Sequence, residues 1–182
     1  GVGKQKPQLV GYNSESADLR ILLQRALVHG VQAADFARRP EKPWEGVDYF
    51  AGGDWHVDLM TVIGGRGRGR PSLHEVAAAS GIPGKFTTEG GEVADLWMGG
   101  QLASIINYNE RDALTTYLVW LRLAHFGGFF SPAEYLQEQQ LVEDLLRDEG
   151  KHPGREHLTG YLEEWRRVRR EAGTAGQIQL NF

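Results

Sequence analysis

The stretch Leu9-Val-Gly-Tyr-Asn13-Ser-Glu-Ser-Ala-Asp18-Leu-Arg-Ile-Leu-Leu-Gln-Arg-Ala-Leu-Val-His-Gly30 decides the fold class. Its apolar, β-prone start predicts a short buried strand. Leucines then recur at helical spacing until Gly30, and Ser14 or Ser16 could cap that helix. Asn13 falls at the switch from strand to helix, where Asn is also a common turn residue. A strand that runs into a helix predicts an α/β fold, whose functional sites lie at such strand ends.

A second set of polar residues lies in Ile105-Ile-Asn-Tyr108-Asn-Glu-Arg-Asp112-Ala-Leu-Thr-Thr-Tyr117. On a helix, Tyr108 and Asp112 share one face and lie one turn apart. The carboxylate could hold a divalent cation, and the phenol beside it could orient a water molecule for attack. The alternative is a helix with a partly buried tyrosine and an unrelated surface aspartate. Asp18 has a similar alternative, because the dipole of its helix favours a carboxylate in the first turn.

Together, these segments resemble the predicted 3′-to-5′ exonucleases related to the proofreading domain of family B DNA polymerases. The second family motif is similar to Asn13 followed by Asp18, and the third, in its tyrosine (DEDDy) form, to Tyr108 through Asp112. Three intervening stretches are similar too, and the whole resemblance spans roughly residues 7 to 165: His56-Val-Asp58-Leu-Met, Ser72-Leu-His-Glu-Val-Ala77 and Gly81-Ile-Pro-Gly84-Lys85.

The resemblance implies an α/β fold of the ribonuclease-H-like (DnaQ-like) type, helix-rich in its C-terminal portion. It also implies hydrolysis of single-stranded nucleic acid from the 3′ end by two Mg²⁺ or Mn²⁺ ions, with DNA as the favoured substrate. Asp112 would bind the first ion and Asp18 the second, Tyr108 would orient the attacking water, and Asn13 would help to position the terminal nucleotide. Tyr12, Trp55 and Phe86 are candidates for stacking on the last bases.

Two features depart from the family pattern. Ala17 precedes Asp18, where the family usually has an aromatic residue. The first motif, an Asp-x-Glu on the opening strand, is absent, since none of the nine aspartates is followed two positions later by Glu. We therefore expect the chain to be the C-terminal part of a longer protein and to be inactive, or nearly so, by itself, because two carboxylates leave the cations short of oxygen ligands. Evolved loss of the motif is the alternative.

Composition is consistent with a globular cytoplasmic protein. The 182 residues are 41% hydrophobic and include five tryptophans, enough for a sizeable core. The absence of cysteine excludes disulfides and thiolate zinc sites. We expect no signal peptide and no membrane span. A net charge of −4 argues against a generally basic nucleic-acid coat but leaves room for a local basic track. We expect an exonuclease domain over residues 1–130 and a helical extension over 131–182.

Two basic segments could contact nucleic acid. Arg66, Arg68 and Arg70 alternate with glycines before Pro71, as in an AT-hook core. The capping box that follows, Ser72 to Glu75, indicates that this stretch is a loop between two helices. Three interpretations stay open: an ordinary loop, a phosphate-contacting loop or a true AT-hook. In the tail, an apolar helical face stands against a set of arginines, so that the tail either docks on the core or offers a basic surface.

Other motifs contribute little. The histidines show no metal-ligand spacing, so we treat His56 only as a weak ligand candidate, and Asp58 as a possible helix cap. Lys85 could reach a phosphate, but a plain surface lysine is the better interpretation. The rival to an exonuclease is a non-catalytic nucleic-acid-binding module with a degenerate exonuclease fold, and a purely structural helical protein is a third possibility. A binding module would still bind single strands after Asp112→Asn, without any metal.

Overall fold

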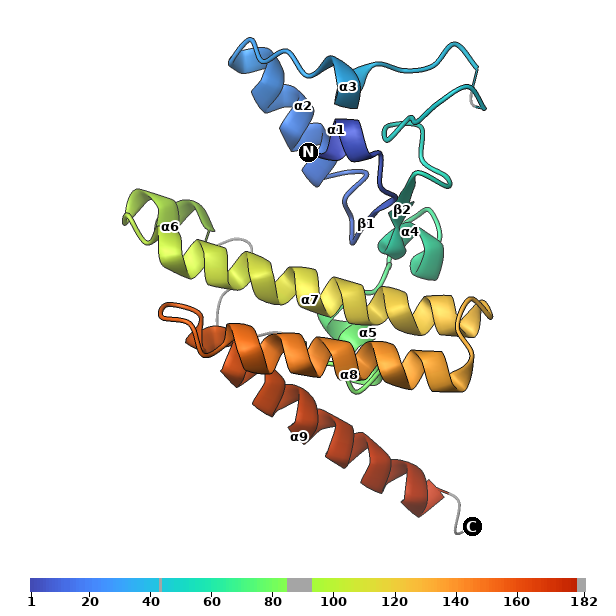
Figure 1. Ribbon diagram of the computed structural model, residues 1–182, viewed down its shortest axis with the longest axis vertical. Coiled ribbons are helices and arrows are strands. Elements are labelled where there is room, and N and C mark those ends of the chain that lie inside the picture. The colour runs from blue at the N-terminus through green and yellow to red at the C-terminus, as the bar shows by residue number, and fades with distance from the viewer. Residues whose placement is uncertain (43, 85–92, 180–182) are drawn as a thin grey trace. The chain divides into compact units, whose positions relative to one another are not determined.

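The computed structural model describes residues 1–42, 44–84 and 93–179, with the side chains of 173–179 left aside. These residues form two compact units, Gly1–Pro71 and Ser72–Phe182, each considered by itself. Figure 1 traces the chain through both units. The described part is mainly helical with one small parallel sheet. This architecture is compatible with the predicted α/β class.

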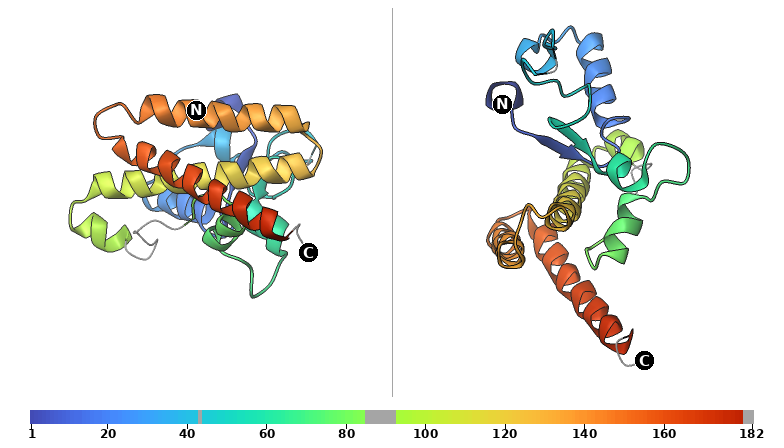
Figure 2. Two further views of the ribbon diagram at one scale, coloured as in Figure 1. Left: turned by 90° about the horizontal axis from the view of Figure 1, so that it is seen from below. Right: turned by 90° about the vertical axis from the view of Figure 1, so that its right-hand side faces the viewer.

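The first unit is built around a two-stranded parallel sheet. Strand β1 (Leu9–Gly11) pairs with β2 (His56–Asp58), in the register Leu9 to His56 and Gly11 to Asp58. Each strand is followed by a helix, as Figures 1 and 2 show: α2 (Asp18–Val28) after β1 and α4 (Leu59–Gly64) after β2. Two short helices complete the unit, α1 (Val2–Gln5) and α3 (Ala34–Ala37). The unit thus contains two strand-to-helix junctions side by side.

The start of α2 differs from the prediction. Neither Ser14 nor Ser16 caps the helix; its N-cap is Ala17, which has no side chain able to accept a hydrogen bond. Ser14 is buried, and its hydroxyl shares a hydrogen bond of 2.8 Å with Nε2 of His56. The helix ends as predicted, before Gly30, whose φ of 62° is readily adopted by glycine.

The second unit consists of helices. A capping box between Ser72 and Glu75 opens α5 (Leu73–Ala79), as predicted. After α6 (Val93–Met98), three long helices follow: α7 (Leu102–Phe126), α8 (Pro132–Glu149) and α9 (Glu156–Gln179). Figure 1 shows α7 and α8 running side by side in opposite directions, and α9 following the end of α8 and leading away from both at an angle. Helix α9 contacts both α8 and α7. No helix within the described ranges is long and apolar enough to cross a membrane.

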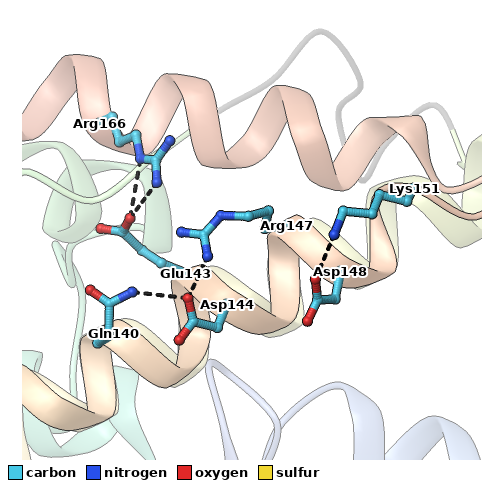
Figure 3. Close-up of polar contacts among 7 residues, drawn as sticks. All are labelled: Gln140, Glu143, Asp144, Arg147, Asp148, Lys151 and Arg166. Carbon is cyan, nitrogen blue, oxygen red and sulfur yellow. Dashed lines mark hydrogen bonds and ion pairs between the residues drawn. The ribbon is translucent and has the colours of Figure 1, made fainter.

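The tail helix packs on the unit through its apolar face. Leu158, Tyr161, Leu162 and Trp165 are buried, as the sequence predicts. Its arginines are engaged in ion pairs: Arg166 and Arg169 both reach Glu143 of α8, at 2.7 and 3.0 Å, and Figure 3 shows the first of these pairs. These contacts favour the docking interpretation of the tail over the basic-surface interpretation.

Candidate active site: two groups of motif residues

The turn after β1 is held by one buried carboxylate. Both oxygens of Asp58, at the end of β2, accept backbone hydrogen bonds: Oδ1 from Asn13 at 2.9 Å and Oδ2 from Glu15 at 3.0 Å. Asp58 Oδ1 also accepts the N–H of Met60 at 3.0 Å and so caps α4, as predicted. The carboxylate therefore fixes the start of one helix and the turn before another.

This support explains the backbone of Asn13. Its φ is 60°, in the left-handed region that Asn tolerates better than most residues. With the backbone N–H of Asn13 bound to Asp58, the turn has a defined geometry. From it the chain enters α2, where Asp18 occupies the first turn and is exposed. Within the described part of the chain, no hydrogen bond or ion pair engages the Asp18 carboxylate. Asp18 is therefore free to meet a ligand from solvent.

Tyr108 and Asp112 lie together on α7, as the four-residue spacing predicts. The phenol donates a hydrogen bond to the carboxylate. Burial, followed by this hydrogen bond and the charge of Asp112, raises the pKa of Tyr108 to about 12. Burial also raises the pKa of Asp112 above its ordinary value, although the hydrogen bond from Tyr108 opposes that shift. The two side chains thus influence each other's pKa, which favours the interpretation of an interacting pair over that of two unrelated side chains.

The same face of α7 continues into a buried polar contact that the sequence did not reveal. Thr115 donates a hydrogen bond of 3.1 Å to the carbonyl of Pro83, and its oxygen lies 2.9 Å from the hydroxyl of Tyr161 on α9. The charge of Asp112 adds to burial in raising the pKa of Tyr161, so the two groups interact electrostatically. Thr115 lies seven positions after Tyr108, a spacing that helical periodicity could have flagged. The α9 partner could not be inferred.

On the opposite side of this turn, Glu110 connects α7 to the start of α9. Its carboxylate lies 3.0 Å from Arg155 and 2.6 Å from Nε2 of the buried His157. Arg155 also pairs with Glu149 at 2.6 Å. Glu110, which lies between Tyr108 and Asp112 in the sequence, therefore anchors α7 to the start of α9. Sequence periodicity gives no signal for this anchor.

The remaining predicted residues fall in several places. Arg66, Arg68 and Arg70 lie in the loop after α4, in the first unit. His56 is hydrogen bonded to Ser14, which gives it a structural role. Of the stacking candidates, Tyr12 donates to the carbonyl of Pro71 at 2.7 Å, whereas Trp55 is exposed. Lys85 and Phe86 lie outside the described residues.

Carboxylate oxygens are ligands of the kind that Mg²⁺ and Mn²⁺ accept. Asp18 and Asp112 therefore fit such ions by chemistry. By number they do not suffice: among the described residues, no group of three His, Asp or Glu side chains could hold a metal ion. The structure groups Asn13 with the α2 junction and Tyr108 with Asp112, each within its own unit.

No curated protein and no solved structure showed significant similarity to the chain. One family model does match: it covers residues 1–165 and thus both groups of motif residues, from the β1 turn to α9. That family is described as a predicted 3′-5′ exonuclease related to the exonuclease domain of PolB. The match extends over most of the 182 residues. The chain therefore belongs to the family of predicted 3′-5′ exonucleases related to the PolB exonuclease domain.

Proposed function

We propose that the chain carries part of the active site of a metal-dependent exonuclease. The enzyme would remove nucleotides from the 3′ end of single-stranded nucleic acid, and DNA is the substrate that we favour. The observation that carries the proposal is the hydrogen-bonded pair of Tyr108 and Asp112 on α7, in a chain of this family. We further propose a ribonuclease-H-like fold for the complete domain. The parallel pairing of β1 with β2, each strand leading into a helix, supports that assignment.

The state of Tyr108 limits what it can do. With its pKa raised to about 12, the phenol stays protonated at neutral pH and cannot act as a general base. Its proton is donated to Asp112, which leaves the oxygen lone pairs free to accept a hydrogen bond from water. Tyr108 would therefore orient the attacking water through its oxygen, and the water would lose its proton to another acceptor.

Asp18 and Asp112 are the carboxylates that we assign to Mg²⁺ or Mn²⁺. When bound, such ions lower the pKa of a water molecule and stabilise the charge on the attacking and leaving oxygens. Burial raises the pKa of Asp112, because it disfavours the ionised carboxylate. A bound cation would stabilise that ionised form. Asp18, exposed on α2, would meet its ion in a more hydrated setting, with water completing the coordination.

The number of ligands sets the expected activity. The family pattern implies an Asp-x-Glu pair as the remaining carboxylates, and residues 1–182 contain none. Two carboxylates would leave the cations bound mostly by water, weakly and without fixed geometry. We therefore propose that these residues alone have little or no nuclease activity. A non-catalytic nucleic-acid-binding module is the second candidate, favoured by the absent Asp-x-Glu and by Ala17 in place of the family's aromatic residue.

The test is degradation of 3′-labelled single-stranded DNA with Mn²⁺. Residues 1–182 are compared with the same residues together with any coding sequence that lies in frame upstream, and each with its Asp112→Asn variant. Shortening from the 3′ end that requires the upstream sequence and disappears with Asp112→Asn supports both proposals. Strong degradation by residues 1–182 alone contradicts the proposed inactivity. Binding without any degradation by either protein selects the binding module.

A further inference from the structure

The loop after α4 presents arginines to solvent, and its two ends lie close together. Its two ends meet, since a Cβ placed on Gly64 would lie 3.1 Å from Cβ of Arg70 and 3.0 Å from Cδ of Pro71. Glycines alternate with the arginines, and Gly65 and Gly69 have φ values of 67° and 77°, a conformation that favours glycine. The segment is therefore a compact surface loop with a defined base.

The guanidinium groups of this loop are available to an external anion. Arg66 and Arg68 are exposed, and Arg70 is partly buried at the base of the loop. Within residues 1–42, 44–84 and 93–179, none of the three forms an ion pair or a hydrogen bond that would neutralise it. The arginines of α9 are different, because Arg166 and Arg169 bind Glu143. The loop thus keeps unneutralised positive charge in a chain whose net charge is −4.

The loop is fixed to the candidate-site turn at both of its ends. At its C-terminal end, the hydroxyl of Tyr12 donates to the carbonyl of Pro71 at 2.7 Å. At its N-terminal end, the loop follows α4, whose cap is the Asp58 carboxylate that also holds the N–H of Asn13. Tyr12 and Asn13 are consecutive residues of one turn. The position of the loop is therefore coupled to the position of Asn13 through the two hydrogen-bonding side chains Tyr12 and Asp58.

From this coupling we infer that the loop Gly65–Arg70 is a phosphate-binding element that holds the backbone of single-stranded nucleic acid beside the Asn13 turn. The inference rests on the proposed function, because the Asn13 turn is where the terminal nucleotide would lie. Guanidinium groups bind phosphate oxygens in a planar, forked geometry and read no base sequence. A single loop without further basic flanks suits such contacts better than the minor-groove contacts of an AT-hook.

The size of the effect follows from counterion release. On single strands, each phosphate contact contributes a slope of about 0.7 to the dependence of log Kd on log salt concentration. Two exposed arginines would contribute about 1.4, so a fourfold rise in salt would weaken their share of binding by roughly 7-fold. Homopolymers and mixed sequences should respond equally, because these contacts carry no base information.

The experiment measures binding of fluorescent oligo(dT) and of a mixed-sequence strand by anisotropy, in EDTA, at about 50 and about 200 mM salt. The double variant Arg66→Gln/Arg68→Gln is compared with Arg25→Gln/Arg38→Gln, which removes the same charge from exposed positions of the same unit. We expect the first variant to lose affinity and the salt slope to fall by about 1.4, and the second to bind nearly as the unaltered chain does. Equal losses in both variants would overturn the inference.

Two further arms sharpen the result. Tyr12→Phe keeps every arginine but removes the hydroxyl that ties the loop to its place, and we expect a several-fold loss of affinity with an unchanged fold by circular dichroism. Vesicles with and without anionic lipid test the other source of phosphate; capture on anionic vesicles with no binding to oligonucleotides would overturn the assignment to nucleic acid. Because binding is measured without metal, the binding result can still be interpreted if the protein proves to have no exonuclease activity.

Discussion

The carboxylate of Asp58 holds the backbone N–H of Asn13 at 2.9 Å, across 45 positions of sequence. The bond joins the end of β2 to the turn after β1, two points that the parallel register already places side by side. It makes Asp58, which has no direct part in the proposed chemistry, the residue that sets the geometry of the Asn13 turn. A positioning role of this kind leads to a test on stability.

Asp58→Asn should lower the free energy of unfolding by about 2–3 kcal/mol, since one of the two accepting oxygens becomes an amide that cannot accept from a backbone N–H. Asp58 is buried, so water cannot replace the lost acceptor. Urea denaturation followed by circular dichroism measures the change. Asp54→Asn, at an exposed position nearby in sequence, is the matched control and should change stability little. Equal stability of both variants would show that Asp58 does not support the turn.

Tyr108 should titrate as a strongly shifted phenol. The difference in absorbance near 295 nm between the unaltered chain and Tyr108→Phe should show one phenolate with a midpoint near pH 12. The sign for stability follows from the raised pKa: the contribution of Tyr108 is fully present below about pH 10 and is lost as pH rises through about 12. A midpoint near pH 10 would mean that the phenol is neither buried nor bonded to Asp112.

In whichever form of the protein degrades DNA with Mn²⁺, Asp112→Asn should abolish that activity, and in residues 1–182 it should not reduce the thermal stability at neutral pH. Burial raises the pKa of Asp112, so the protonated form is the one that folding favours, and its contribution disappears as pH rises through the folded-state pKa. Asn resembles that protonated form. Differential scanning calorimetry at about pH 7.5 should therefore give a Tm equal to or above that of the unaltered chain.

The comparison for Asp112→Asn is Asp95→Asn, which changes the same chemical group at an exposed position of the same unit. Asp95→Asn should leave the activity unchanged. A marked fall in Tm for Asp112→Asn alone would show that the ionised carboxylate stabilises the fold, contrary to the direction of its pKa shift.

Thr115→Val should destabilise the second unit by about 1–3 kcal/mol, although the two side chains have nearly the same shape. The hydroxyl of Thr115 is buried and connects the carbonyl of Pro83 with the hydroxyl of Tyr161. Urea denaturation would measure the loss. Thr116→Val, at the next and less buried position, is the control. Indistinguishable stabilities would mean that the contact adds nothing to the packing of α9 on α7.

The elements that local pattern could predict were those with a short-range cause. The β1 run, the end of α2 before Gly30 and the Ser72–Glu75 capping box all follow from residues a few positions apart, although β1 is only partly buried and not buried as predicted. The pairing of Tyr108 with Asp112 also follows, since a helix places residues four apart on one face.

What sequence could not predict depends on contacts between distant residues. Ser14 had every property of an N-cap, yet its hydroxyl bonds to His56, 42 positions away. In the same way, no residue near Thr115 in the sequence predicts its contact with Tyr161, 46 positions away. Such partners are decided by how strands and helices pack, and local periodicity carries no record of that packing.

Glu110 gives α7 a fixed rotational setting. The residue lies midway between Tyr108 and Asp112, and its carboxylate is bound by Arg155 and His157 at the entrance to α9. Turning α7 about its own axis would pull Glu110 from both partners before it could redirect the phenol and the carboxylate. The direction in which Tyr108 and Asp112 point is therefore held by a contact on another side of the helix. A substitution at Arg155 or His157 would change that direction, although neither residue touches the pair.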